Sequence, residues 1–290
     1  MRPNIEAILF DIGGTLRANQ STGGRDLSSI RKLQACIGDQ RDPLDFADLI
    51  RCRELEYRKW AQRSLLESTE MELWTKYLLP DYPADLVQKN VMALNGYWRE
   101  SQLNKILPDA VDTIRSLSDR GYKLGIISNT TTSIEGPTLI RENGIESLFE
   151  TLILSTVFGR RKPHPSIFLE AAEQIGVLPE HCAYVGDQLS RDLIGPRQAG
   201  YGEVVIIDIR GYDLQGTLPD DDIAQNNCIS AMEPDFKIQH LTELLTLYPD
   251  ANHHEPKKFQ PVQLYDAALS TMWGVDQRVP FNQTFEIGRK

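Results

Sequence analysis

The chain has 290 residues and a formal net charge of −10, and 41% of its residues are hydrophobic and 25% charged. This composition is ordinary for a globular protein with a buried core, and the length allows one large domain or two smaller ones. The acidic balance argues against nucleic acid or an anionic membrane as a partner, because neither phosphate backbone would be neutralised. A small anionic substrate stays possible, since a local group of basic residues can override the net charge.

The cysteines and the N-terminus indicate the compartment. The four cysteines are scattered without metal-ligand spacing, which disfavours zinc and suits reduced thiols: Cys36, Cys52, Cys182 and Cys228. Acidic residues interrupt the apolar stretch near the N-terminus, so it predicts a strand rather than a signal peptide. No apolar run approaches the roughly 18 residues of a membrane span. We therefore expect a cytoplasmic protein without membrane contact.

The first predicted element is a buried strand. Residues 7–10 are all apolar, and Gly13 and Gly14 predict a tight turn soon after them. This arrangement places Asp11 at the carboxyl end of the strand, where ligands bind in open α/β sheets. A short strand followed by Asp and two glycines also occurs in structural turns, so the remainder of the chain has to decide.

A long helical stretch follows, over residues 26–105. Leucine and aromatic residues recur there at near-helical spacing, β-branched residues are few, and Pro80 and Pro83 break the stretch into separate helices. From Pro108 on, helices and strands alternate, with glycines at helix ends. The expected strands are 123–127, 151–154, 182–185 and 203–207, and one more strand and helix are expected at 235–238 and 241–247. The alternation predicts βαβ units and a parallel, doubly wound sheet that includes the first strand.

Polar residues follow three of the later strands or the loops after them. Ser128 and Asn129 follow one strand, Lys162-Pro163 precedes a helix that starts at Pro165, and Gly186-Asp187 ends another strand with Asp192 five residues later. Each has a structural alternative: a turn-forming serine, a solvated basic loop, and an acidic residue favoured at a helix start. Arg160 and Arg161 are expected to be surface charges.

With these motifs in order, the chain resembles the haloacid dehalogenase-like hydrolases, whose first motif is Asp-x-Asp-x-Thr. The stretch here is Asp11-Ile12-Gly13-Gly14-Thr15. The resemblance implies that Asp11 is the nucleophile and that Gly13 replaces the usual general acid/base. It also implies that Ser128, the backbone of Asn129 and Lys162 hold a substrate phosphate. Lys162 would also act in catalysis, by offsetting the repulsion between the nucleophile and an anionic substrate.

The same resemblance implies a magnesium ion. Its ligands would be Asp11, Asp187 and the Gly13 carbonyl, while Asp192 would orient Lys162. Mg²⁺ prefers one or two carboxylates together with waters and a substrate phosphate, which suits this set.

The resemblance covers roughly residues 5–208 and predicts a domain layout. A Rossmann-like core would comprise 1–17 and 106–248, a helical cap would be inserted as 18–105, and 249–290 would be a C-terminal extension without an assigned role. The cap is expected to move about its two connections, with Gly23 and Gly24 as hinges. Substrate-selecting candidates within it are Arg51, Arg53, Arg58, Lys59 and Trp60.

The predicted function is a Mg²⁺-dependent phosphatase that acts on a small phosphorylated metabolite through an aspartyl-phosphate. General acid/base catalysis is worth about 10²–10⁴-fold, and Gly13 cannot supply it. One alternative is a catalytically impaired phosphate-binding or regulatory protein. Another is a dehalogenase-type hydrolase, whose halide leaving group needs no proton, although Asp187 and Asp192 favour a metal. The sequence names neither a substrate nor an oligomeric state.

Overall fold

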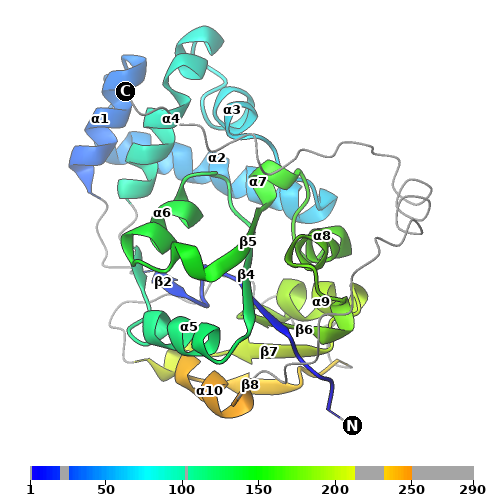
Figure 1. Ribbon diagram of the computed structural model, residues 1–290. Coiled ribbons are helices and arrows are strands. Elements are labelled where there is room, and N and C mark those ends of the chain that lie inside the picture. Colours follow the sequence, from blue (N-terminus) through cyan, green and yellow to red (C-terminus); the bar gives the residue numbers. More distant parts are fainter. Residues whose placement is uncertain (1, 20–25, 102–103, 213–231, 250–290) are drawn as a thin grey trace, which may run out of the picture. The chain divides into compact units, whose positions relative to one another are not determined.

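Six parallel strands form the central sheet of the computed structural model, which describes residues 2–19, 26–101, 104–212 and 232–249. The hinge candidates Gly23 and Gly24, and the extension from residue 250 on, lie outside these residues. The strand order is β5-β4-β1-β6-β7-β8 (Figure 1). The strands are β1 (Ala7–Phe10), β4 (Lys123–Ser128), β5 (Phe149–Leu154), β6 (Cys182–Gly186), β7 (Glu203–Ile207) and β8 (Phe236–Ile238). The expected doubly wound parallel sheet is confirmed.

Strand β1 lies between β4 and β6 and is buried on both faces. Its side chains alternate with the period of two that a strand imposes. Ile8 and Phe10 belong to one apolar cluster, and Ala7 and Leu9 belong to another. The first cluster includes residues of α5 (Ala110–Asp119), α6 (Glu135–Glu142) and α10 (Leu244–Leu247), and the second includes α8 (Pro165–Ile175). Two layers of helices therefore hold the strand that ends at Asp11.

The helical region, residues 27–100, has an apolar cluster of its own, in which Trp74 and Phe46 are fully buried. It consists of α1 (Leu27–Ile37), α2 (Pro43–Ser64), α3 (Glu70–Glu72), the π-helical turn η1 (Leu73–Leu78) and α4 (Ala84–Glu100). The break expected at Pro80 and Pro83 lies between η1 and α4. Among the described residues, no helix is both long and apolar enough to cross a membrane.

The connections into and out of the helical region pair with each other. Strand β2 (Arg17–Asn19) and strand β3 (Asn104–Ile106) form a two-stranded antiparallel ribbon. Strand β2 precedes the stretch that was expected to be helical, residues 26–105, and β3 lies at its end. The chain therefore enters and leaves the helical region through one shared element.

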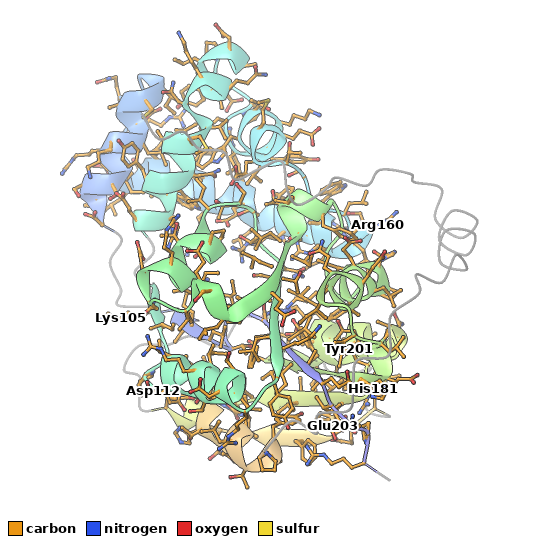
Figure 2. The ribbon with its side chains drawn as sticks, viewed as in Figure 1. Lys105, Asp112, Arg160, His181, Tyr201 and Glu203 are labelled. Atoms are coloured by element: carbon orange, nitrogen blue, oxygen red, sulfur yellow. The ribbon has the colours of Figure 1, made fainter. Side chains whose placement is uncertain are left out.

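A further contact joins the helical region to the sheet domain and was not expected. Residues 65–68 run beside residues 155–161, and we call this the Glu67 contact. Two backbone hydrogen bonds hold it: the Glu67 N–H donates to the Gly159 carbonyl at 3.0 Å, and the Arg161 N–H donates to the Leu65 carbonyl at 3.2 Å. Arg160, labelled in Figure 2, pairs with Leu66 between them. The helical region is therefore attached to the sheet domain here as well as through the β2–β3 ribbon.

The remaining short elements complete the sheet domain. Helix α7 (Ser155–Phe158) lies directly after β5, and α9 (Ile194–Gln198) follows the π-helical turn η4 (Leu189–Leu193). Short 3₁₀ turns are η2 (Glu146–Leu148), η3 (Pro179–His181), η5 (Ile209–Gly211) and η7 (Leu241–Glu243). Among these short elements, helix α7 and the π-helical turn η4 matter for the site, because they position the residues that surround the carboxyl ends of β1 and β6.

Candidate active site

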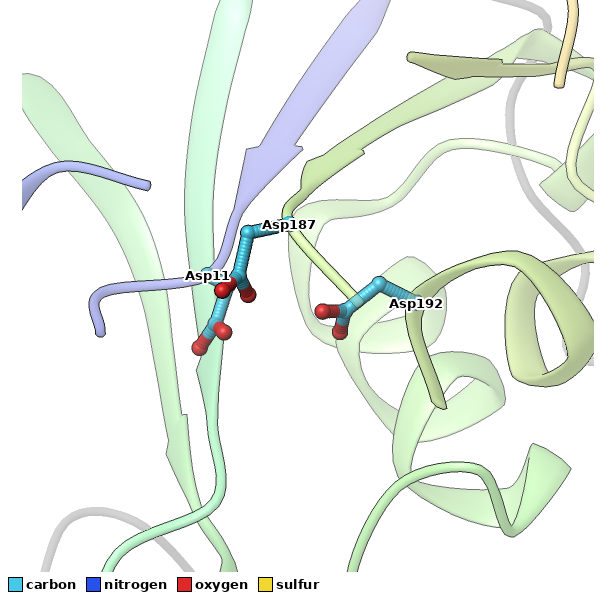
Figure 3. A group of neighbouring side chains, drawn as sticks. All are labelled: Asp11, Asp187 and Asp192. Carbon is cyan, nitrogen blue, oxygen red and sulfur yellow. The ribbon is translucent and has the colours of Figure 1, made fainter. Parts of the chain in front are cut away.

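Three aspartates meet at the carboxyl edge of the sheet (Figure 3). Asp11 follows β1, Asp187 follows β6, and Asp192 lies on η4. The register pairs Phe10 with Val185, so the two strands end side by side. One carboxylate oxygen of each aspartate lies within 4.8 Å of the others. The structure thus brings together the acidic residues predicted from widely separated motifs.

The two glycines of the first turn have different roles. Gly14 has a φ of 78°, and a Cβ there would lie 2.1 Å from an oxygen of Asp187, so only glycine fits. Gly13 is not among the residues with positive φ, and the nearest atom to a Cβ built there is Arg17 Nη2 at 3.7 Å. The backbone therefore does not require glycine at the position where the family carries its second aspartate.

Lys162 lies beneath the nucleophile candidate, and its ammonium group has three partners. Its Nζ is 3.0 Å from Asp11 Oδ1 and 2.7 Å from Asp192 Oδ1, and it donates to the Tyr184 hydroxyl at 2.7 Å. The three partners match the three N–H donors of a lysine, so the side chain is held in one place. Tyr184 was not identified from the sequence. The alternation of side chains along β6 could have indicated it, because Tyr184 lies on the same face of the strand as the apolar cluster that includes α8.

Burial and neighbouring charges shift the pKa values of the three aspartates in different directions. Burial raises the pKa of Asp11, although Lys162 and Arg191 oppose the rise. Burial also raises the pKa of Asp187, to about 8, against the opposing effect of Arg191. Burial alone would raise the pKa of Asp192 too, but Lys162 and Arg191 outweigh it and hold that pKa below its ordinary value. The cluster is therefore short of positive charge near Asp11 and Asp187.

Ser128 and Asn129 lie at the end of β4, and both line the cavity that Asp11 also lines. The Asn129 side chain has a structural partner, because its Nδ2 donates to the Lys162 carbonyl at 3.0 Å and its Oδ1 accepts from the Lys162 N–H at 2.8 Å. The peptide bond from Lys162 to Pro163 is cis. The Asn129 amide thus fixes the backbone of Lys162, a role that the sequence did not indicate.

The cavity above Asp11 has a volume of about 150 Å³ and is lined mainly by polar residues. Residues of the sheet domain and of the helical region share its wall, and the latter contribute Arg58, Asn95 and Arg99. Of the five candidates in the helical region, Arg58 is the one that lines it. The others lie elsewhere: Arg51 and Lys59 are largely exposed, Arg53 pairs with Asp81, and Trp60 packs on Tyr57 and Tyr77.

Arg161 corrects one expectation. It was expected to be a surface charge, but its side chain is 11% exposed and lines the cavity. Its Nη1 lies 3.3 Å from the carboxylate of Glu67, which also accepts hydrogen bonds from the hydroxyls of Tyr57 and Ser155. A carboxylate from the helical region thus compensates the buried guanidinium. Neither Glu67 nor Arg161 was identified from sequence, because their pairing is a long-range contact.

The residues present suit a divalent metal ion. Asp11 and Asp187 offer hard carboxylate oxygens, which Mg²⁺ prefers. A positive group already lies among them, because the Arg191 guanidinium contacts both carboxylates, at 3.4 Å from Asp11 and 3.0 Å from Asp187. The position between these two aspartates is therefore one where a cation is stabilised.

Comparisons with known proteins agree with this arrangement. The chain is 37% identical to the glyceraldehyde 3-phosphate phosphatase of Methanopyrus kandleri over 143 residues, which are 49% of this chain and 55% of that relative. It is 26% identical to the phosphoglycolate phosphatase of Nitrosococcus oceani over 228 residues, which are 74% of this chain and 90% of that relative. The chain thus spans about half the length of the first of these two relatives.

A solved structure and a family model define the fold and the family. The 2-haloacid dehalogenase from Pseudomonas syringae pv. tomato DC3000 superposes with a TM-score of 0.54 at 23% identity, over 84% of this chain and 98% of that one. This likeness shows the shared fold. The model of the haloacid dehalogenase-like hydrolases matches residues 5–200. The chain therefore belongs to the haloacid dehalogenase-like hydrolase family.

Proposed function

We propose that this protein is a Mg²⁺-dependent phosphatase that uses Asp11 as its nucleophile and acts on a small phosphorylated metabolite. One observation carries the proposal: the Asp11 carboxylate lines a polar cavity and is held from behind by Lys162 at 3.0 Å. A carboxylate in this position can attack phosphorus, while the buried ammonium offsets its repulsion from an anionic substrate. The two curated relatives described above are named as phosphatases, which supports the same chemistry.

The reaction has two steps. An oxygen of Asp11 forms a bond to phosphorus while the bond from phosphorus to the leaving oxygen breaks. Water must protonate that oxygen, because Gly13 has no acidic group. A second water then attacks the aspartyl-phosphate, which releases inorganic phosphate and restores Asp11. The weakened acid/base catalysis favours substrates with good leaving groups, such as aryl, acyl or anomeric phosphates.

Other residues bind and position the substrate. The Ser128 hydroxyl and the Asn129 backbone N–H would hold phosphate oxygens, and both residues line the cavity at the end of β4. Asp192 orients Lys162 through the 2.7 Å ion pair. Asp11, Asp187 and the Gly13 carbonyl would hold the metal, which when bound supplies positive charge to the transferring phosphoryl group.

The helical region acts as a cap in this proposal. Residues 18–105 would cover a core made of 1–17 and 106–248, and Arg58, Asn95 and Arg99 would contact the part of the substrate beyond the phosphate. The cavity, at about 150 Å³, is smaller than the 300–1,000 Å³ that is common for ligand pockets. This size supports a substrate of a few carbon atoms.

An assay with p-nitrophenyl phosphate tests the proposal. We expect turnover with Mg²⁺ that is lost in excess chelator and lost in Asp11→Asn. Undiminished turnover in chelator would contradict the metal requirement and favour the dehalogenase-type alternative. Because Gly13 removes the usual acid/base, a phosphate-binding protein with negligible turnover is the second candidate. Binding of inorganic phosphate without hydrolysis of any phosphate ester in a metabolite panel would establish it.

A further inference from the structure

Arg191 contacts every carboxylate of the aspartate cluster. Its Nη2 lies 3.0 Å from Asp187 Oδ1 and 3.4 Å from Asp11 Oδ2, and its Nε lies 3.3 Å from Asp192 Oδ2. The guanidinium is planar and carries donors on several nitrogens, so one side chain can bridge three acceptors. Arg191 was not identified as a site residue from the sequence.

Two of the three contacts of Arg191 are with the carboxylates proposed to hold the metal, at 3.0 Å from Asp187 and 3.4 Å from Asp11. Asp11 and Asp187 each contribute one oxygen to the guanidinium. A divalent ion that binds these oxygens would lie beside the guanidinium charge, and two cations that contact the same carboxylates repel each other strongly in a buried site. The metal and the guanidinium therefore compete for the same oxygens.

The cavity gives Arg191 space to move away. Its side chain is 15% exposed and forms part of the cavity wall, whereas Lys162, the other cation of the cluster, is fully buried. Lys162 is held by three partners beneath Asp11. Of these two cations, Arg191 is therefore the one that can leave without opening the packed core.

We propose that Arg191 is an internal cation that occupies the metal position in the metal-free protein and must be displaced when Mg²⁺ binds. This inference rests on the metal site of the proposed function. The chain should then have a weakened apparent affinity for Mg²⁺ and a cluster whose negative charge is partly compensated without metal. Arg191 thus sets the Mg²⁺ concentration at which the site becomes active.

Calorimetric titration of the full chain with Mg²⁺ alone, without substrate, tests this competition. Arg191→Met removes the charge while keeping much of the side-chain volume, and Arg191→Lys keeps the charge on a single nitrogen. Arg197→Met is the matched control, because Arg197 also pairs with an aspartate, Asp235, but away from the cluster. We expect Arg191→Met to bind Mg²⁺ at least about tenfold more tightly than the wild type, Arg191→Lys to fall between them, and Arg197→Met to match the wild type.

Equal or weaker Mg²⁺ binding by Arg191→Met would overturn the inference and leave a magnesium-dependent phosphatase intact. Absence of Mg²⁺ binding in both proteins would overturn the inference and the metal site together. Thermal unfolding gives a second readout that needs no activity. In metal-free buffer Arg191→Met should melt below the wild type, because three clustered carboxylates lose a cation, and saturating Mg²⁺ should remove the difference. A difference that persists at saturating Mg²⁺ would also overturn the inference.

Discussion

The two sides of the cavity are held in place by different kinds of contact. On the sheet side, Asp11 and Asp187 extend from adjacent parallel strands, and backbone register fixes their spacing. On the helical side, Arg58 and Arg99 come from helices with a separate apolar cluster. That region joins the sheet domain through the β2–β3 ribbon and the Glu67 contact. We infer that chemistry depends on the rigid side and substrate choice on how the other side is held.

The segment 155–165 belongs to both sides. Its first part forms the Glu67 contact, Lys162 follows, and His164 caps the helix α8. A change in how the helical region is held can therefore reach the ammonium group beside Asp11 through a few residues of backbone. Substitutions on each side of the cavity, and then within this shared segment, test whether the two sides have these different roles.

The largest effect is expected on the sheet side. Asp11→Asn removes the nucleophilic carboxylate but keeps its size, so turnover of p-nitrophenyl phosphate should fall by more than about 10³-fold for every substrate. Asp112→Asn, on the exposed surface of α5 (Figure 2), is the control and should retain wild-type kinetics. Substantial activity in Asp11→Asn, with an unchanged circular dichroism spectrum, would show that another group attacks the substrate.

On the helical side, Glu67→Gln should destabilise the protein and alter selectivity. The buried carboxylate pairs with Arg161, and breaking a buried pair of this kind costs about 3 kcal/mol. Burial already lowers the pKa of Arg161, so its charge has little other compensation from solvent. Urea unfolding would measure the loss of stability, and the ratio of kcat/KM for phosphoglycolate and p-nitrophenyl phosphate would measure selectivity.

The matched control for Glu67→Gln is Glu72→Gln. Glu72 lies nearby in the chain and pairs with Lys76, but both side chains are largely exposed. Exposed pairs contribute roughly 0–1 kcal/mol, so this variant should unfold near the wild-type midpoint. If both variants behave alike, the Glu67 contact does not hold the helical region in the way proposed here.

Gly13→Asp should restore part of the missing acid catalysis. The backbone allows a side chain there, and a carboxylate would lie near Arg17, whose charge favours the ionised form and reduces the fraction that holds a proton to donate at neutral pH. We expect turnover of alkyl phosphates to rise roughly tenfold to a hundredfold and that of aryl phosphates to change little. Gly13→Asn fills the same space without a proton to give and should show no gain. Equal gains on both substrate classes would mean that the added carboxylate acts at a step other than protonation of the leaving oxygen.

The sheet side could be predicted from the sequence because its signals are local. Asp11 and Asp187 each follow a short apolar run, and the carboxyl ends of parallel strands meet at one edge of a sheet. The alternation of helix and strand after Pro108 gave that sheet directly. The ligand set and the role of Lys162 came from the family resemblance, and the geometry is consistent with them.

The contacts that were missed depend on groups that are distant in sequence or on side-chain direction. Glu67 and Arg161 lie far apart along the chain, and nothing in the run Arg160-Arg161-Lys162 shows which cation is buried. Arg191 directly precedes Asp192, but the direction of its side chain depends on the π-helical turn η4. The spacing of leucine and serine there does not predict a π-helical turn. The β2–β3 ribbon joins two short segments across the whole helical region.

The last prediction concerns His164, in the segment shared by both sides. Its Nδ1 accepts from the Ser166 N–H at the start of α8, a bond that only the neutral ring can make. Burial, with Arg160 as a smaller cause, lowers its pKa from 6.5 to about 4. Between these values the unfolded chain binds the extra proton, so this stability is complete above pH 6.5 and is lost as the pH falls toward 4. At pH 5 the expected loss is about 2 kcal/mol.

His164→Asn keeps a capping acceptor that does not titrate, so its urea midpoint should fall less than that of the wild type between pH 7.5 and pH 5. Identical losses in the two proteins would assign the acid sensitivity to other groups and leave His164 as a cap alone.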